Sequence, residues 1–318
     1  MKYRIGIDLG GTAIKAGIVD ENYNIVCRHS VATNAMNRSF EQVVEDMAAA
    51  AVQAAGMAGL SLSDFPCVGV GTPSCISPKT GLLVFSNNTN WRNVPIRQEL
   101  EKHLKLPVYI GNDANCAVVG ESVTGAARGF QDVVMLTLGT GVGSGLVIGG
   151  KLYAGADGMG AELGHTPFIY GGEPCTCGAC GCVEAYASVT ALIRDTKRAM
   201  AEHPESAMHE HAARHGGAVT GKTSFDCAKA GDAAALAVAE RYCDYVAAAI
   251  AGAVTVFRPQ IVLIGGGVSN AGAFLLDRLN ERAVRRVFAG DIIGVPPIVA
   301  AKLGNDAGIV GAAYLDQW

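Results

Sequence analysis

Aromatic side chains, charged side chains and runs of like charge are all scarce in this chain of 318 residues. Aromatic residues make up 6% of the sequence and charged residues 17%, and no block of Lys and Arg exceeds two residues. With 25 basic and 29 acidic side chains, the formal net charge is -4. Because binding to a phosphodiester backbone requires a concentrated positive surface, we expect no nucleic-acid partner.

The sequence also lacks a segment typical of a signal peptide or a membrane span. Its first residues contain too short an apolar run and no small-residue cleavage site. The most apolar stretch, residues 233–257, is interrupted by Glu240, Arg241 and Asp244, which are costly at the depth of a bilayer. We therefore expect a cytoplasmic protein with no membrane contact and a buried core helix over 233–256.

Small residues are abundant instead. The chain has 41 glycines and 50% hydrophobic residues, and its length suggests about two domains at roughly 150 residues each. Ten cysteines in a reducing compartment argue against a disulfide scaffold. Four of them crowd together at Cys175, Cys177, Cys180 and Cys182, which indicates a metal site.

Two similar glycine hairpins are predicted, one in each half of the chain. Residues 3–9 form a strand, a glycine turn follows, and residues 14–19 run back. The same order returns in an apolar strand over 133–138, a turn over 139–145 and a return over 146–148. Glycine hairpins are common, so one coincidence is weak evidence, but the repeat predicts two related α/β domains that face one another.

Alternating apolar periods between the hairpins predict an α/β fold with much parallel pairing. Helices are expected over 40–58, 233–256 and 275–287 and from about 305, and buried strands over 67–70, 108–110 and 261–264. Residues 202–223 hold four of the seven histidines without a clear period and predict an exposed excursion with no metal site. Residues 216–223 match G-x-x-x-x-G-K-T formally, but no strand precedes them, so we interpret this match as coincidence.

Three glycine-lined strand ends are candidates for nucleotide binding. Backbone N–H groups at tight turns donate to phosphate oxygens, Thr12 adds a hydroxyl, and Asp8 can hold the hydration shell of a magnesium ion. The alternative is that these are plain turns. The candidate residues are Asp8, Gly10, Gly11, Thr12, Gly139, Thr140, Gly141, Gly265, Gly266 and Gly267.

Two further groups of polar residues are candidates for a general base and for a metal site. Asp113 follows the strand over 108–110 and is flanked by Asn112 and Asn115, a position suited to general-base work on a hydroxyl, although a helix cap uses the same residue types. The cysteine cluster and His165 offer soft ligands for a structural zinc ion. Both an all-cysteine site and His165 with three cysteines are chemically possible.

These motifs, in this order and spacing, resemble the ROK sugar kinases over essentially the whole chain. The segments that carry the resemblance are residues 8–12, 111–115, 138–143, 162–165, 175–184 and 265–269. Residues 88–91 and 303–308 are most similar to the glucokinase branch.

The resemblance implies an actin-like ATPase fold, related to ribonuclease H, with two α/β domains and an inter-domain cleft. The first domain would span residues 1–117, completed by the C-terminal helix over about 304–318. The second would span residues 118–303 and contain a zinc loop over 165–182. A homodimer is also expected from the resemblance.

The resemblance further implies an ATP-dependent, magnesium-requiring hexose kinase that phosphorylates glucose at the 6-hydroxyl. Asp113 would be the catalytic base, and the implied sugar ligands are Asn88, Asn112, Asp113, Glu162, His165 and Glu184. The implied zinc ligands are His165, Cys175, Cys177 and Cys182, with Cys180 left over. His165 would bind zinc through one ring nitrogen and face the sugar with the other.

Two departures from the family pattern bear on substrate choice. Ser74 stands where the family usually has a glycine at the sugar rim, so other hexoses remain alternatives: N-acetylmannosamine, N-acetylglucosamine, allose or fructose. Cys180 could compete for zinc. A sugar-sensing regulator is a further alternative, which the start of the first strand near Tyr3 disfavours, because it leaves no room for a helix-turn-helix.

Overall fold

A computed structural model describes residues 2–86 and 89–318 of the chain. By its internal contacts the chain divides into two compact units. The first comprises residues 1–133, 145–161 and 302–318, and the second comprises residues 134–144 and 162–301. The domain boundary expected at residue 117 falls inside helix α3 (Asp113–Val123).

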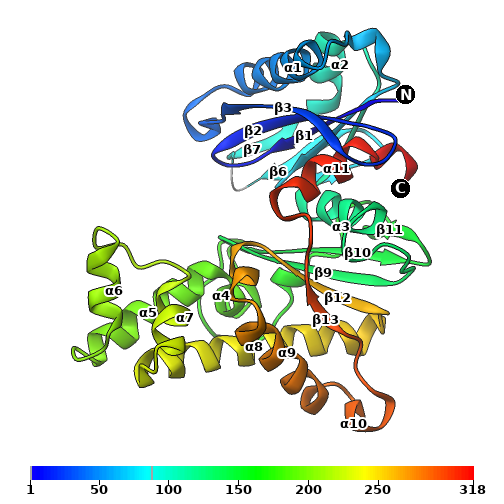
Figure 1. The fold of residues 1–318 in the computed structure, drawn as a ribbon. Coiled ribbons are helices and arrows are strands. Elements are labelled where there is room, and N and C mark those ends of the chain that lie inside the picture. The colour runs from blue at the N-terminus through cyan, green and yellow to red at the C-terminus, as the bar shows by residue number, and fades with distance from the viewer. Residues whose placement is uncertain (1, 87–88) are drawn as a thin grey trace. The chain divides into compact units, whose positions relative to one another are not determined.

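The first sheet has the order β3-β2-β1-β4-β8. Strands β1, β2 and β3 pair antiparallel, whereas β1, β4 and β8 are parallel. Helices α1 and α2 cover one face and helices α11 and α3 the other (Figure 1). The bounds are β1 (Arg4–Leu9), β2 (Ala13–Val19), β3 (Ile25–Ala32), β4 (Val68–Thr72), β8 (Val108–Asn112), α1 (Phe40–Met57), α2 (Ile96–Leu104) and α11 (Ala307–Ala313). The first unit also contains a small antiparallel sheet of three strands, β5 (Cys75–Ser77), β6 (Leu82–Ser86) and β7 (Trp91–Val94).

The second five-stranded sheet repeats this order as β11-β10-β9-β12-β13. When the strands of each sheet are counted along the chain, both sheets have the spatial order third, second, first, fourth, fifth. The repeat inferred from the glycine hairpins is therefore a repeat of topology. The strands are β9 (Val133–Leu138), β10 (Val142–Ile148), β11 (Lys151–Tyr153), β12 (Ile261–Gly265) and β13 (Ile298–Ala300). The helices of this half are α4 (Glu184–Ala187), α5 (Val189–Glu202), α6 (Met208–Arg214), α7 (Thr223–Lys229), α8 (Ala233–Phe257), α9 (Ala273–Arg286) and α10 (Gly290–Ile293).

The structure adds to or corrects two local predictions. The turn expected over 139–145 is shorter, because the N–H of Gly139 bonds to the carbonyl of Gly141 and β10 already begins at Val142. Residues 202–223 are largely exposed as expected, but helix α6, which the prediction did not include, forms there and buries Met208 and Ala212, which lie four residues apart on one face. The phosphate-loop match at 216–223 follows this helix rather than a strand, as the sequence interpretation required.

The apolar stretch over 233–257 is the core helix α8, with a buried face. Its two acidic residues pair with α9: Glu240 bonds to Arg278 and Arg282, and Asp244 to Arg282 and Arg286. Among the described helices, none is both long enough and apolar enough to cross a bilayer.

Glycines let helix α11 lie directly on the first sheet. A Cβ placed on Gly6 would lie 2.0 Å from the carbonyl oxygen of Ile309, and one on Gly69 would lie 1.7 Å from that of Ala312. These are backbone atoms, which cannot rotate away. Any side chain at either position therefore forces the helix off the sheet.

We expect Gly69→Ala to lower the free energy of unfolding by about 2–3 kcal/mol through this overlap. The matched control is Gly56→Ala in α1, where a Cβ meets nothing within 4 Å and removal of backbone freedom should raise stability by roughly 0.5–1 kcal/mol. Urea denaturation of the two variants measures both effects. Equal stabilities would contradict the close packing of α11.

Candidate active site

The carboxyl edge of the first sheet brings the predicted phosphate and base positions together. Asp8 at the end of β1 is in register with Gly71 on β4, and Gly71 is in register with Gly111 on β8. A Cβ on Gly71 would lie 3.7 Å from the Cα of Asp113. Gly71 thus leaves room for the start of α3 beside Asp8, in the first unit.

Asp113 is the first residue of α3, and Asn112 is its N-cap. The Asn112 Oδ1 accepts from the N–H groups of Ala114 at 2.8 Å and Asn115 at 3.2 Å, so the capping alternative is realised by Asn112. Its side-chain NH₂ is not used in the cap and can serve as a donor to a ligand. The Asp113 carboxylate, which is half-buried, accepts from the N–H of Ala114 at 2.9 Å.

The first glycine turn keeps its donors exposed. The N–H of Gly10 closes the turn by bonding to the carbonyl of Ala13 at 2.9 Å. Gly11 and Thr12 are exposed, and a Cβ on Gly11 would meet nothing within 4 Å. The turn therefore presents open backbone of the kind that receives a phosphate.

The other two glycine turns lie together in the second unit. Gly266 has a positive φ of 86°, and a Cβ on it would lie 2.1 Å from the carbonyl oxygen of Leu138, the last residue of β9. The carbonyl of Gly139 accepts from the N–H of Val189, and the carbonyl of Thr140 from the hydroxyl of Thr190. Residues 265–267 are thus packed on the turn over 139–141, which is tied to the start of α5.

Glu184, at the start of α4, joins this turn to the cysteine loop. Its Oε2 accepts from the N–H of Val142 at 3.0 Å, and its Oε1 accepts from the hydroxyl of Thr176 at 2.7 Å. A Cβ on Gly141 would lie 2.2 Å from Oε2, so only glycine permits this approach. Glu162 is close to the same groups: burial raises the pKa of its carboxyl, His165 opposes that rise, and Glu184 adds to it.

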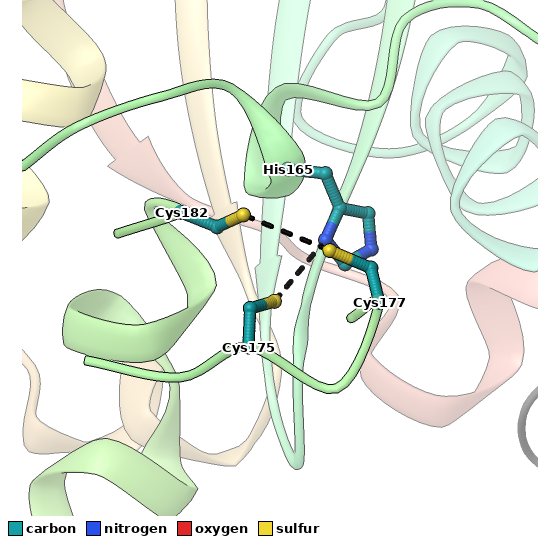
Figure 2. Close-up of side chains that lie close together, drawn as sticks. All are labelled: His165, Cys175, Cys177 and Cys182. Carbon is teal, nitrogen blue, oxygen red and sulfur yellow. Dashed lines mark hydrogen bonds between the residues drawn. The ribbon is translucent and has the colours of Figure 1, made fainter. Parts of the chain in front are cut away.

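His165, Cys175, Cys177 and Cys182 form one compact cluster in the second unit (Figure 2). One potential ligand atom from each lies within 4.8 Å of all the others. Cys175 Sγ is 3.6 Å from His165 Nδ1, and Cys177 Sγ is 3.7 Å from Cys182 Sγ. The second ring nitrogen of His165 is on the side of the ring away from the sulfurs (Figure 2).

These distances suit a tetrahedral ion with soft ligands. Zinc bonds of about 2.3 Å to sulfur and about 2.0–2.1 Å to nitrogen place tetrahedral ligand atoms roughly 3.5–3.8 Å apart. Three thiolates with one imidazole are also a donor set that zinc prefers. The cluster therefore fits a closed, structural zinc site.

Backbone pairing holds the cysteine loop in this shape. Phe168 and Ile169 both donate to the carbonyl of Gly181, and Cys175 donates to the carbonyl of Ala179 at 2.8 Å. Cys180 is exposed and pairs with Pro174 in an isolated antiparallel β-bridge. In the described part of the chain it lies outside the group of four potential metal ligands. Among the described residues, no cysteine forms a disulfide.

Three other residues need separate mention. Ser74 is buried between β4 and β5, and its hydroxyl lies 3.4 Å from both oxygens of Thr72, so it faces the end of β4. Asn88, an expected sugar ligand, lies outside the described residues. Asn115 is 5% exposed, and its Oδ1 has no hydrogen-bond partner among the described residues; the sequence flagged it only as a neighbour of Asp113.

Lys15 was missed by the sequence interpretation altogether. It stands opposite Asp8 in the antiparallel register of β1 and β2, and its Nζ is 3.2 Å from the Asp8 carboxylate. Only the strand register, which places residues seven apart in sequence side by side, brings it to the edge of the site.

The chain belongs to the ROK family, whose model matches residues 4–317. It is 39% identical over 318 residues to a glucokinase from Thermotoga maritima, covering 98% of this chain and 96% of that protein. The structure of a ROK family glucokinase from Streptomyces griseus in complex with glucose and AMPPNP matches with a TM-score of 0.87 at 36% identity, covering 99% of this chain and all of that one. A ROK hexokinase from Thermus thermophilus matches with a TM-score of 0.78 at 33% identity, covering 98% and 97%. The actin-like ATPase fold of two α/β domains is thereby confirmed.

Proposed function

We propose that this protein is an ATP-dependent sugar kinase that transfers the γ-phosphoryl group of ATP to the 6-hydroxyl of glucose. The structural observation that carries the proposal is the carboxyl edge of the first sheet, where Asp8, the open glycine turn and Asp113 are neighbours. Relatives of high coverage that are named glucokinases support the same activity.

In this mechanism Asp113 accepts the proton of the attacking hydroxyl. Phosphoryl transfer has a loose transition state, so most of the rate comes from positioning and from charge neutralisation rather than from strong nucleophilic activation. The N–H groups of Gly11 and Thr12 would hold phosphate oxygens. Asp8 would hold Mg²⁺ through its hydration shell, and that ion supplies further neutralisation of the phosphate charge.

The remaining proposed ligands act on the sugar or the nucleotide. The NH₂ group of Asn112 and the side chains of Glu162, His165 and Glu184 would bind sugar hydroxyls, as Asn88 would. The glycine turns over 139–141 and 265–267 would approach the nucleotide. A zinc ion held by His165, Cys175, Cys177 and Cys182 would have a structural role and would fix the orientation of His165.

We further propose a cytoplasmic homodimer that binds no nucleic acid. Ten cysteines without a disulfide among the described residues fit a reducing compartment. Sedimentation velocity at micromolar concentration measures the association state, and a monomer at all concentrations would exclude the dimer.

The experiment that tests the activity is an ADP-release assay over a panel of hexoses and N-acetylhexosamines. We expect glucose to give the highest kcat/KM, because the polar groups of a sugar site discriminate strongly between hydroxyl patterns. A preference for an N-acetylated sugar, allose or fructose would assign a different sugar to the same chemistry. Sugar binding without any ADP release would instead favour a sugar-sensing regulator.

A further inference from the structure

Tyr186 joins the cysteine loop, residues 165–182, to helix α4 in the second unit. It follows Glu184 by two residues and is 7% exposed, and its hydroxyl oxygen accepts from the backbone N–H of Glu173 at 2.7 Å. Glu173 comes two residues before Cys175, the first cysteine of the ligand group. The hydroxyl therefore ties the loop to the helix that carries a proposed sugar ligand.

The position of this hydroxyl is set by packing on both sides. A Cβ placed on Gly172 would lie 2.0 Å from the hydroxyl oxygen, so the loop approaches Tyr186 closely only because a glycine precedes Glu173. The ring of Tyr186 packs against Phe168, with ring centroids 5.7 Å apart, and against Tyr245 of α8, with centroids 5.2 Å apart. The hydroxyl is thus a fixed point against which the loop is placed.

Glu173 connects this fixed point to both arms of the loop. Its carbonyl accepts from the N–H of Gly181 at 2.8 Å, and Gly181 directly precedes Cys182. On the other arm, Cys175 follows two residues after Glu173. A displacement of Glu173 therefore shifts the backbone beside a proposed zinc ligand on each arm.

The side chain of Glu173 has a second, weaker anchor on helix α5. Its carboxylate accepts from Arg198 Nη1 at 2.7 Å, and the two side chains are 27% and 56% exposed. Exposed ion pairs contribute little, because water and salt screen them. A hydrogen bond to a buried hydroxyl costs more to lose, because the N–H that remains has no partner. Tyr186 is therefore the anchor that decides where Glu173 lies.

We infer that Tyr186 is a positioning residue for the proposed zinc site, because its hydroxyl fixes the start of the cysteine loop and so holds the ligands ready for the ion. Without the hydroxyl, binding of the ion must also order the loop, which lowers the affinity for the ion. Since the ion would in turn orient His165, the proposed sugar site depends on Tyr186 indirectly. The inference rests on the proposed zinc site and adds a residue outside its ligand set.

The test is competition for zinc between the protein and a chelator, which does not depend on turnover. We expect Tyr186→Phe, which removes a single oxygen, to weaken zinc binding about 10-fold, the lower end of the range for groups that orient metal ligands. Gly172→Ala should have a similar effect, because its methyl group displaces the hydroxyl from the loop. The phenylalanine lacks the oxygen that this methyl group meets, so the two losses should not add in the double variant.

Tyr242→Phe and Arg198→Met are the matched controls. The hydroxyl of Tyr242 is also buried and donates to the carbonyl of Ala187, the last residue of α4, at 2.9 Å. Its loss should lower the free energy of unfolding without changing the zinc affinity. Arg198→Met should change the zinc affinity by less than about 3-fold, as the exposure of its ion pair requires.

Glucose binding separates positioning of the loop from a general folding defect. Tyr186→Phe should bind glucose as the wild type does when zinc is in excess, and more weakly than the wild type when free zinc is limiting. Weak glucose binding that excess zinc does not restore would overturn the role of Tyr186. So would wild-type zinc affinity in Tyr186→Phe, or an equal loss of zinc affinity in Tyr242→Phe, and each of these results leaves the zinc site and the kinase proposal standing. A wild type that binds no zinc overturns the zinc site as well, while its phosphorylation of glucose would preserve the kinase proposal.

Discussion

Replacing Asp113 by Asn should lower kcat by about 100-fold or more, the usual contribution of a positioned general base, while the dissociation constant for glucose changes little. An asparagine has the same shape, and its oxygen can still accept from the N–H of Ala114, which is 2.9 Å from the carboxylate. The helix start is therefore retained and only the proton acceptor is lost. Steady-state kinetics and equilibrium glucose binding measure the two quantities separately.

Asp132→Asn is the matched control for this variant. Asp132 also accepts a backbone N–H bond, from Gly149 at 2.9 Å, but at an exposed turn. It should keep wild-type turnover. Near-normal kcat in Asp113→Asn would remove Asp113 from the base role, and a large loss of glucose affinity would make it mainly a binding residue.

Replacing Cys177 by Ser should abolish binding of the proposed zinc ion and weaken glucose binding about 10–100-fold, the range found when groups that orient a ligand are removed. Cys177 is exposed, so the serine is tolerated sterically, whereas Cys182 is buried. Without the ion, His165 Nδ1 keeps only its contact with Cys175 Sγ, and the orientation of the imidazole toward the proposed sugar is less fixed. Metal content per chain and glucose affinity are the measurements.

Cys180→Ser provides the control within the same loop. Because Cys180 lies outside the ligand group among the described residues, this variant should retain one zinc ion per chain and full glucose affinity. Loss of zinc in Cys180→Ser, or its retention in Cys177→Ser, would contradict the assigned ligand set. Equal glucose affinity with and without zinc would show that the metal ion does not contribute to sugar binding.

Elements defined by strong local patterns could be predicted from the sequence. Strand β9 and helix α8 begin where expected, because an apolar run and a capping Asp232 mark them locally. The start of β10 could not be predicted, since its glycines look like turn residues. Gly145 is in fact a strand residue that needs no side chain because it lies against the carbonyl of Ala114.

The parts of the candidate site that the sequence left open depend on long-range geometry. Spacing alone permitted several sets of four ligands, and only the folded loop separates Cys180 from the rest. Lys15 became visible only through the register of β1 and β2. Helix α6 was missed because only Met208 and Ala212 of its short length are buried, which is too weak a period to recognise.

The seating of α11 on the first sheet also has a consequence for biosynthesis. The guanidinium of Arg4 donates to the carbonyl of Ala313, a contact across a sequence separation of 309 residues. At about 5–20 residues per second, a ribosome takes on the order of tens of seconds to make the intervening chain. During that interval α11 is missing from the face of the first sheet that it shares with α3, so the first unit is completed only after translation of the second.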